Sequence, residues 1–371
     1  MSLNKKDNFL AINIAHVKID EESQRAVLAV LQSGQLAQGV KVEEFEEKFA
    51  SYIGSKHAVA VNSGTAALHA GLLAAGIGEG DEVITTPFSF VASTNCILFC
   101  GAVPIFVDIN DQTFNIAPEL IEEKISPKTK AIIIVHLYGQ PCDMDNILTL
   151  CKKHNLVLIE DACQSHGAEY DRHKVGSFGI GCFSFYATKN MVTGEGGMIT
   201  TNDKDLAYKA KMIRHHGQHQ RDVVNLLGYN YRMTDIAATL GICQLKNLDL
   251  ANQKRIQNAK YLSEHISQIV GLVPPYIAPN RTHVFHQYTI KVTEEYKMSR
   301  NELQEKLIKQ KIGSAVYYPT PIHKQPLYRN LGYNYNLPAS EKAAEQVLSL
   351  PVHPSLSSTE LKKIVEALVG P

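Results

Sequence analysis

Three consecutive segments decide the fold: KAIIIVHLYG (130–139), MDNILTLCKKHN (144–155) and LVLIEDA (156–162). The first and third are unbroken apolar runs of strand length, and the second has the length and composition of a helix. Strands that are apolar throughout are buried on both faces, and strands joined through helices form parallel sheets with helices on both sides. These segments therefore predict an α/β fold.

The same alternation extends in both directions, from about residue 56 to residue 201. Strand-like runs precede helical ones in HAVAVN (57–62) with TAALHAGLLAAG (65–76), DEVITTP (81–87) with residues 89–100, and AVPIFVD (102–108) with APELIEEKI (117–125). Two further strands are expected at CFSFYAT (182–188) and GMITT (197–201). This region predicts a large domain whose mostly parallel sheet is sandwiched by helices.

The remaining third of the chain has a different rhythm. A helical section is expected over residues 203–266, and the domain boundary is placed near Leu248 within it. Beyond it, HQYTIKV (286–292) and GSAVYYP (313–319) resemble strands, whereas SRNELQEKLIKQK (299–311), ASEKAAEQVLSL (339–350) and STELKKIVEALV (358–369) resemble helices. We predict a large cofactor-binding domain over residues 1–248 and a smaller α+β domain over residues 249–371.

Composition excludes several classes of protein. Across 371 residues, 37 basic side chains balance 37 acidic ones, which argues against a dedicated nucleic-acid binder. The seven cysteines lie between Cys96 and Cys243 without a C-x-x-C pair, a pattern typical of reduced thiols and not of a disulfide framework or a zinc site. We therefore expect a cytoplasmic protein without a metal.

One stretch has the length of a membrane span, because no charged residue lies between Glu82 and Asp108. Its two prolines and several polar residues fit a strand, a helix and a second strand better. The N-terminal MSLNKKDNFL has no apolar run of the kind that export signals carry. We expect no membrane association and no export.

Ligands of open parallel sheets bind at the carboxyl ends of the strands. Asn62-Ser63-Gly64-Thr65 lies at such a position, between a strand and a helix. The exposed N–H groups and the dipole of a helix N-terminus suit a phosphate. The alternative is a plain helix cap, since Ser and Thr are usual caps.

Glu160-Asp161 closes another strand, where a carboxylate facing the cleft needs a cationic partner. A protonated ring nitrogen would be such a partner, and a cap or salt bridge is the alternative. Lys189 follows an aromatic strand and precedes Gly194-Glu195-Gly196-Gly197, where desolvation would lower its pKa and favour Schiff-base chemistry. A phosphate anchor, a carboxylate and a lysine after strands of one sheet match the needs of pyridoxal phosphate.

Nine segments, in order from residue 33 to about residue 328, resemble the DegT/DnrJ/EryC1/StrS family of sugar aminotransferases. These are pyridoxal-phosphate enzymes with the aspartate aminotransferase fold (fold type I). The segments are SGQLAQGVKVEEFEEKFA, VNSGTAALHAGL, DEVITTPFSFVAST, IIIVHLYGQPCDMD, IEDACQSHGAEY, VGSFGIGCFSFYATKNMVTGEGGMI, LGYNYRMTDIAATLG, HQYTIKV and VYYPTPIHKQPLY. The resemblance covers nearly the whole chain.

The resemblance implies two catalytic residues. Lys189 would form the Schiff base with the cofactor and then move a proton, and Asp161 would keep the pyridine nitrogen protonated. Gln164 would hydrogen-bond near the phenolic oxygen of the cofactor. Phe90 would stack on its ring, with ordinary helix packing as the alternative.

The resemblance also implies a phosphate site. Gly64, Thr65 and the hydroxyl of Ser184 would surround the phosphate within the subunit. Asn230 would reach the phosphate bound in the neighbouring subunit. The active site would therefore be shared across a homodimer.

Substrate-binding residues are expected at Arg232, Tyr318 and His323. An arginine suits a carboxylate or a phosphate. His323 and Tyr318 would approach the sugar or its diphosphate, and a loop-stabilising role is the alternative for each. The cluster of His215, His216 and His219 lacks a carboxylate at ligand spacing and is interpreted as a polar segment near the dimer contact, not as a metal site.

The expected reaction is transfer of an amino group from L-glutamate to a keto group of a nucleotide-linked deoxysugar, through the pyridoxamine phosphate (PMP) form of the cofactor. The TGEGG turn after Lys189 resembles members that aminate C4, whereas VYYPTPIHKQP resembles some that act at C3, and C4 is favoured. A sugar dehydratase is an alternative, although some relatives of that kind replace the lysine by histidine. A regulatory or binding protein is the third possibility.

Overall fold

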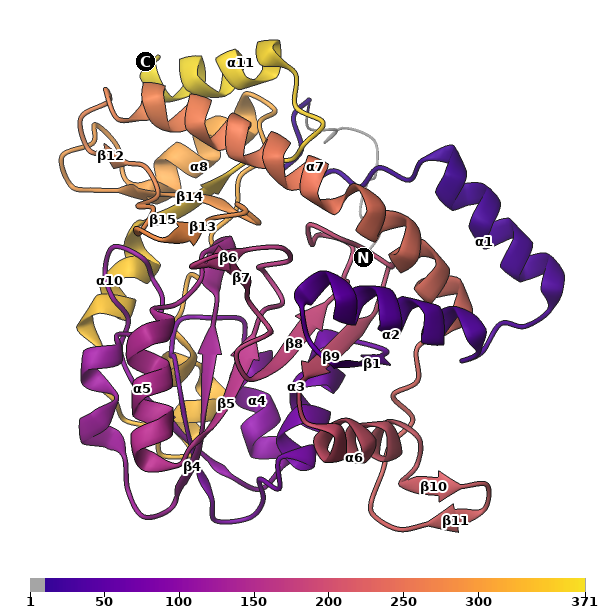
Figure 1. The fold of residues 1–371 in the computed structure, drawn as a ribbon. Coiled ribbons are helices and arrows are strands. Elements are labelled where there is room, and N and C mark those ends of the chain that lie inside the picture. The colour runs from indigo at the N-terminus through magenta and orange to yellow at the C-terminus, as the bar shows by residue number, and fades with distance from the viewer. Residues whose placement is uncertain (1–10, 371) are drawn as a thin grey trace, which may run out of the picture.

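The computed structural model describes residues 11–370, so the N-terminal MSLNKKDNFL segment lies outside the described residues. Its largest element is a seven-stranded sheet in the order β1-β9-β8-β5-β4-β2-β3 (Figure 1). The strands of this sheet are β1 (His57–Val61), β2 (Glu82–Thr85), β3 (Val103–Phe106), β4 (Thr129–Val135), β5 (Val157–Asp161), β8 (Ile180–Ser184) and β9 (Gly197–Thr201). Only β9 runs against its neighbours, so the sheet is mostly parallel as predicted.

Helices cover both faces of this sheet. On one face, α3 (Gly64–Ala74), α4 (Ala92–Phe99) and α6 (Lys204–Arg214) pack against strand residues such as Ala131 and Ile133. On the other face, α5 (Met144–His154) covers Ile132 and Ile134. On the same face, α2 (Val40–Ile53) and the first half of α7 (Asp235–Ile266) cover strand residues such as Phe183. Successive strand residues point to opposite faces, so a strand buried on both sides is apolar throughout. The run KAIIIV is explained by this arrangement.

A second apolar core lies at the C-terminal end of the chain. The antiparallel sheet β12-β14-β15 is covered by α8 (Arg300–Lys309), α11 (Ser358–Val369) and the second half of α7. Its strands are β12 (Leu272–Val273), β14 (Tyr288–Val292) and β15 (Val347–Leu350). The predicted boundary at Leu248 falls inside α7, which runs unbroken between the two cores (Figure 1).

The remaining elements are short, except for α1 (Glu21–Ser33), which packs against α7. They comprise α9 (Pro326–Asn330), α10 (Pro338–Gln346), the pairs β6 (Glu169–Tyr170) with β7 (His173–Lys174) and β10 (Gln218–Gln220) with β11 (Val223–Val224), and β13 (Arg281–Thr282). Four 3₁₀ turns complete the list: η1 (Pro118–Leu120), η2 (Glu122–Lys124), η3 (Leu137–Gly139) and η4 (Ile322–Lys324).

Four predicted elements were wrong in part. APELIEEKI forms only η1 and η2 and no α-helix. GSAVYYP makes one isolated bridge, from Ala315 to Ser349, instead of a strand, and it ends at Pro319. In ASEKAAEQVLSL the helix ends at Gln346. The last four residues of the segment, VLSL, form β15, which pairs with β14. The section 203–266 is interrupted by the hairpin of β10 and β11 between α6 and α7.

The uncharged stretch between Glu82 and Asp108 forms β2, α4 and β3, as its prolines and polar residues predicted. Over residues 11–370, no helix combines the length and the apolar character that crossing a membrane requires.

Candidate active site

The predicted phosphate turn lies between β1 and α3. Ser63 caps the helix, because its Oγ accepts a hydrogen bond from the N–H of Ala66 at 3.1 Å. Gly64 lies so close to its neighbours that a Cβ there would be 2.6 Å from Cβ of Ser184 and 3.0 Å from Sγ of Cys163. Within residues 11–370, the N–H groups of Gly64 and Thr65 have no hydrogen-bond partner, so the helix presents two free donors beside Ser184.

Asp161 is the last residue of β5, and its side chain is almost fully buried. Its Oδ2 accepts a hydrogen bond of 2.6 Å from Oγ of Ser93, and its Oδ1 accepts one of 3.2 Å from the N–H of Cys163. The hydroxyl of Ser89 lies 3.1 Å from that of Ser93. Two donors from different elements therefore fix the orientation of this carboxylate.

The neighbouring Glu160 is held in a different way. Its two oxygens accept hydrogen bonds from the N–H groups of Gly176, Phe178 and Gly179, at 2.7, 2.9 and 2.8 Å. Nε2 of His136 lies 3.2 Å from the same carboxylate, which is fully buried. Four contacts occupy both oxygens, so Glu160 fixes the loop before β8 and has no free capacity for a ligand.

Lys189 lies in a turn shortly after β8, closed by its N–H donating to the carbonyl of Tyr186 at 2.9 Å. Burial lowers the pKa of Lys189, while Cys163 and Asp161 oppose that effect. Asn190 fixes the turn by donating to Oδ1 of Asn252 at 2.9 Å and to the carbonyl of Val284 at 3.1 Å. The lysine is thus held near Asp161, and its pKa is below that of an exposed lysine.

Gln164 and Tyr318 are joined by a hydrogen bond of 3.2 Å from Nε2 of Gln164 to the phenol oxygen. Oε1 of Gln164 accepts from the N–H of Tyr138 at 2.9 Å, and burial raises the pKa of Tyr318. Phe90 was predicted to lie in a helix over residues 89–100, but it lies just before α4 and is 57% exposed. The ring centroids of Phe90 and Tyr318 are 6.4 Å apart. These three side chains therefore lie side by side.

Asn230 and Arg232 lie beside the phosphate turn. Asn62 donates its N–H to the carbonyl of Tyr231 at 2.8 Å and its Nδ2 to the carbonyl of Asn230 at 3.3 Å. The side chain of Asn230 is exposed, and a guanidinium nitrogen of Arg232 lies 2.7 Å from Nδ1 of His215. Neither side chain bonds to Lys189 or Asp161 within the described chain, so their predicted roles stay predictions.

His323 is not brought to this site. Its imidazole is 1% exposed, lies 3.1 Å from a carboxylate oxygen of Glu341 in α10 and is 6.2 Å from the ring of Phe106. Burial lowers its pKa. Nε2 is thus engaged within the fold, while Nδ1 is buried and has no partner in the described chain. This geometry favours the loop-stabilising alternative, and a contact of His323 with the sugar stays a prediction.

Two side chains of the site were missed by sequence reasoning. Ser93 was interpreted only as part of a helix. Serines at positions 89 and 93 of a largely apolar stretch could have indicated a polar partner. Cys163 follows Asp161 by two residues and touches the phosphate turn. Its proximity to Gly64 depends on the pairing of β5 with β8 and was not readable from the sequence.

The residues present fit pyridoxal phosphate. The two free N–H groups at the start of α3 suit a phosphate, and the close packing of Gly64 against Ser184 brings the serine beside them. Asp161 can face a protonated pyridine nitrogen, and Lys189 has the lowered pKa that a Schiff-base lysine needs. Within this fold, that combination defines a pyridoxal-phosphate-dependent aminotransferase of fold type I.

The chain belongs to the DegT/DnrJ/EryC1/StrS aminotransferase family, which matches residues 17–369. A pleiotropic regulatory protein of Geobacillus stearothermophilus is 41% identical over 364 residues, covering 97% of this chain and 96% of the relative. GDP-perosamine synthase of Caulobacter vibrioides is 39% identical over 364 residues, covering 96% and 97%. The crystal structure of S. venezuelae DesV in complex with a ketimine intermediate has a TM-score of 0.89 at 36% identity, covering 93% of both chains. The resemblance found in the sequence is confirmed, and the protein is a sugar aminotransferase.

Proposed function

We propose that this enzyme transfers an amino group from L-glutamate to a keto group of a nucleotide-linked deoxysugar, at C4 in preference to C3. The observation that carries the proposal is the convergence of Lys189, Asp161 and the turn at Gly64 at the ends of three strands of one sheet. The relative that is a GDP-perosamine synthase supports a nucleotide-linked sugar as the acceptor.

Each residue has a distinct task in this proposal. When bound, pyridoxal phosphate supplies an aldehyde carbon that takes up the amino group of the donor and passes it to the acceptor. Lys189 holds the cofactor through Nζ and carries the proton that leaves the α-carbon of the donor. Asp161 binds the protonated ring nitrogen, Gln164 holds the phenolic oxygen, and Phe90 covers one face of the ring.

The phosphate is bound by the N–H groups of Gly64 and Thr65 and by the hydroxyl of Ser184. Asn230 completes the phosphate site of the neighbouring subunit, which makes the homodimer the active form. The side chain of Asn230 is exposed, so it is accessible to a second subunit. Arg232 and Tyr318 contact the sugar nucleotide, and Arg232 supplies charge for its diphosphate.

Two other functions are weaker candidates. A sugar dehydratase would use the same cofactor, but the lysine that such relatives replace by histidine is present here as Lys189. A regulatory role is favoured by the name of the Geobacillus relative. A regulator without catalysis would have no need for a lysine with a lowered pKa beside a buried, oriented carboxylate.

The visible absorption spectrum tests the proposal directly. We expect purified protein to bind added pyridoxal phosphate with a yellow band that bleaches on addition of L-glutamate, and we expect Lys189→Ala to form no such band. A band that ignores glutamate would indicate another donor or dehydration, and no band at all would favour the regulatory role. A panel of 3-keto and 4-keto nucleotide sugars would then decide between C3 and C4.

A further inference from the structure

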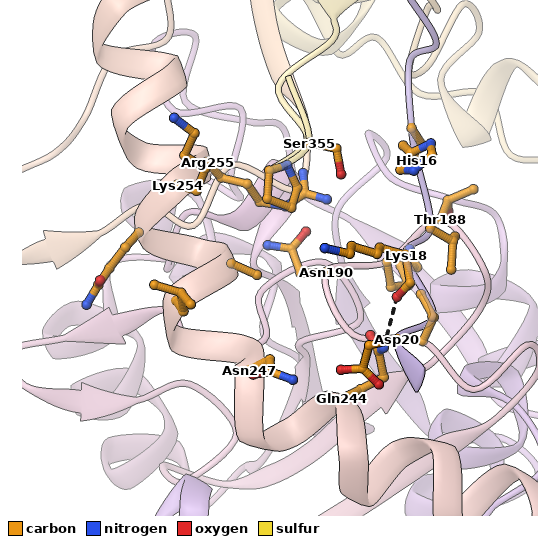
Figure 2. A pocket seen from close by; sticks show the side chains of 18 of the residues that line it. His16, Lys18, Asp20, Thr188, Asn190, Gln244, Asn247, Lys254, Arg255 and Ser355 are labelled. Carbon is orange, nitrogen blue, oxygen red and sulfur yellow. Dashed lines mark hydrogen bonds between the residues drawn. The ribbon is translucent and has the colours of Figure 1, made fainter. Parts of the chain in front are cut away.

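A cavity of about 700 Å³ opens beside the catalytic lysine. Its walls come from the N-terminal segment 15–20, the turn 187–192 that carries Lys189, the middle of α7, and residues 354–355. Figure 2 shows Lys18, Asn190 and Arg255 pointing into the same space from three of these walls. The volume lies in the usual range for small-molecule sites.

The walls of this cavity carry an excess of positive charge. Lys18, Lys254 and Arg255 line it together with Lys189, whose pKa is lowered by burial, and the only carboxylate among its lining residues is Asp20. Asp20 is already engaged as the cap of α1, because it accepts from the N–H of Ser23 at 2.8 Å. Within residues 11–370 Lys18, Lys254 and Arg255 form no salt bridge.

Arg255 gives the cavity a specific requirement. Its side chain is buried, with 5% exposed, and one guanidinium nitrogen donates to the carbonyl of Phe285 at 3.1 Å. Its Nε has no partner in the described chain. Burial lowers the pKa of Arg255 to about 10, and no carboxylate of the described chain offsets that cost. A buried cation is costly unless an anion compensates it, so a bound anion would complete this part of the fold.

We propose that this cavity binds an oxyanion group of a substrate, held by Arg255 and Lys18 next to Lys189. The inference rests on the proposed function, which offers two sources of such a group: the carboxylates of the amino donor and the diphosphate of the sugar nucleotide. Both are accepted by the same guanidinium and ammonium donors. A free lysine at the rim attracts the anion, and the buried arginine fixes its position.

Binding is tested first, without any turnover. The thermal stability of the holoenzyme is measured with inorganic pyrophosphate and, separately, with glutarate, for the wild type and for Lys18→Gln. We expect at least one of the two anions to stabilise the wild type, with an apparent affinity roughly fivefold weaker in the variant. Lys260→Gln is the control for loss of a lysine charge, because Lys260 lies on α7 away from the cavity, and its side chain is 79% exposed.

The proposal is overturned if neither anion stabilises the wild type, or if Lys18→Gln and Lys260→Gln respond equally. Thermal stabilisation can be measured even if the enzyme does not transaminate. The test of anion binding in the cavity is therefore separate from the test of the proposed function. Arg255→Lys, which keeps a charge but loses the planar donor pair, is a second variant and should weaken the same anion.

The two half-reactions then show which substrate supplies the bound oxyanion. Bleaching of the cofactor band is followed against the concentration of L-glutamate, and its return against that of a ketosugar nucleotide added to the pyridoxamine form. A higher half-maximal concentration of glutamate alone in Lys18→Gln assigns the cavity to the donor carboxylates. A change confined to the sugar nucleotide assigns it to the diphosphate, and a change in neither contradicts the proposal.

Discussion

Glu160 and Asp161 are adjacent carboxylates at the end of one strand, and they have opposite surroundings. Glu160 receives three backbone N–H groups and lies beside His136, so both of its oxygens are fully used. Asp161 receives one hydroxyl and one N–H, and it lies beside a lysine with a lowered pKa and a turn with free donors. A carboxylate whose oxygens are fully hydrogen-bonded within the fold maintains structure. A carboxylate that is held in place but keeps acceptor capacity can bind a ligand.

The largest expected effect is a loss of catalytic rate when Asp161 is replaced. Asp161→Asn keeps the shape of the side chain but cannot hold a protonated ring nitrogen by charge. We expect the rate of the glutamate half-reaction to fall about 10³-fold, with little change in the free energy of unfolding. A variant that transaminates at the wild-type rate would remove Asp161 from the proposed mechanism.

Glu160→Gln should show the reverse pattern. The amide nitrogen would replace one acceptor oxygen and face backbone donors, leaving at least one of them buried without a partner. We expect a loss of about 3 kcal/mol in the free energy of unfolding, measured by chemical denaturation at one protein concentration. The folded fraction should retain most of its activity, and a selective loss of turnover would show that the two carboxylates are not separable.

The sequence predicted which residues lie at the ends of the strands, but it did not predict the hydrogen-bond partners of Glu160. Asp161, Lys189 and Gly64 follow strands of one parallel sheet, and such ends meet at one edge. That Asp161 and not Glu160 faces the site follows from the pleat, which places neighbouring side chains on opposite faces. The donors to Glu160 come from residues 176–179, a loop whose position depends on how β5 pairs with β8.

Sequence reasoning failed where long-range packing decides. GSAVYYP has the composition of a strand, but only Ala315 finds a bridge to β15. His323 lies in a segment that resembles a substrate loop, yet Glu341, which follows it by 18 residues, holds its ring in the interior. No local sequence pattern predicts the pairing of His323 with Glu341, because the position of Glu341 depends on how α10 packs against the large domain.

Histidines give a third, smaller contrast. Both ring nitrogens of His136 are paired, with Glu160 and with the N–H of Cys142, whereas neither nitrogen of His166 has a partner in the described chain. Burial lowers the pKa of His166 to about 3, below its value near 6.5 in the unfolded chain. The unfolded state therefore binds more protons as the pH falls below about 6.5, and stability is lost on acidification.

Replacing His166 by Phe should flatten this dependence. Between pH 7 and pH 5 we expect the wild type to lose about 2 kcal/mol more unfolding free energy than His166→Phe. This window lies above the range in which most carboxylates titrate, which isolates the histidine. Denaturation curves at several pH values measure the difference, and parallel curves for the two proteins would show that the pKa of His166 is the same in the folded and unfolded states.

The smallest expected effect concerns Ser93, which acts on the reaction through Asp161. Its hydroxyl donates to Oδ2 of Asp161 at 2.6 Å and thereby orients the carboxylate and stabilises its charge. Without that bond, Asp161 would hold the ring nitrogen less rigidly, so we expect Ser93→Ala to lower the glutamate half-reaction about tenfold. The absorption band of the bound cofactor should also shift its pH dependence, which a purely structural serine would not cause.

Two variants separate this positioning role from loss of packing. Ser93→Thr keeps the hydroxyl and should restore most of the rate, because only a methyl group is added. Ser89→Ala removes the second serine, which lies 3.1 Å from Ser93 but does not contact Asp161 within the described chain, and should change the rate by less than about threefold. Equal losses in Ser89→Ala and Ser93→Ala, with no rescue by threonine, would mean that the start of α4 matters for its packing and that Asp161 is oriented without the serine.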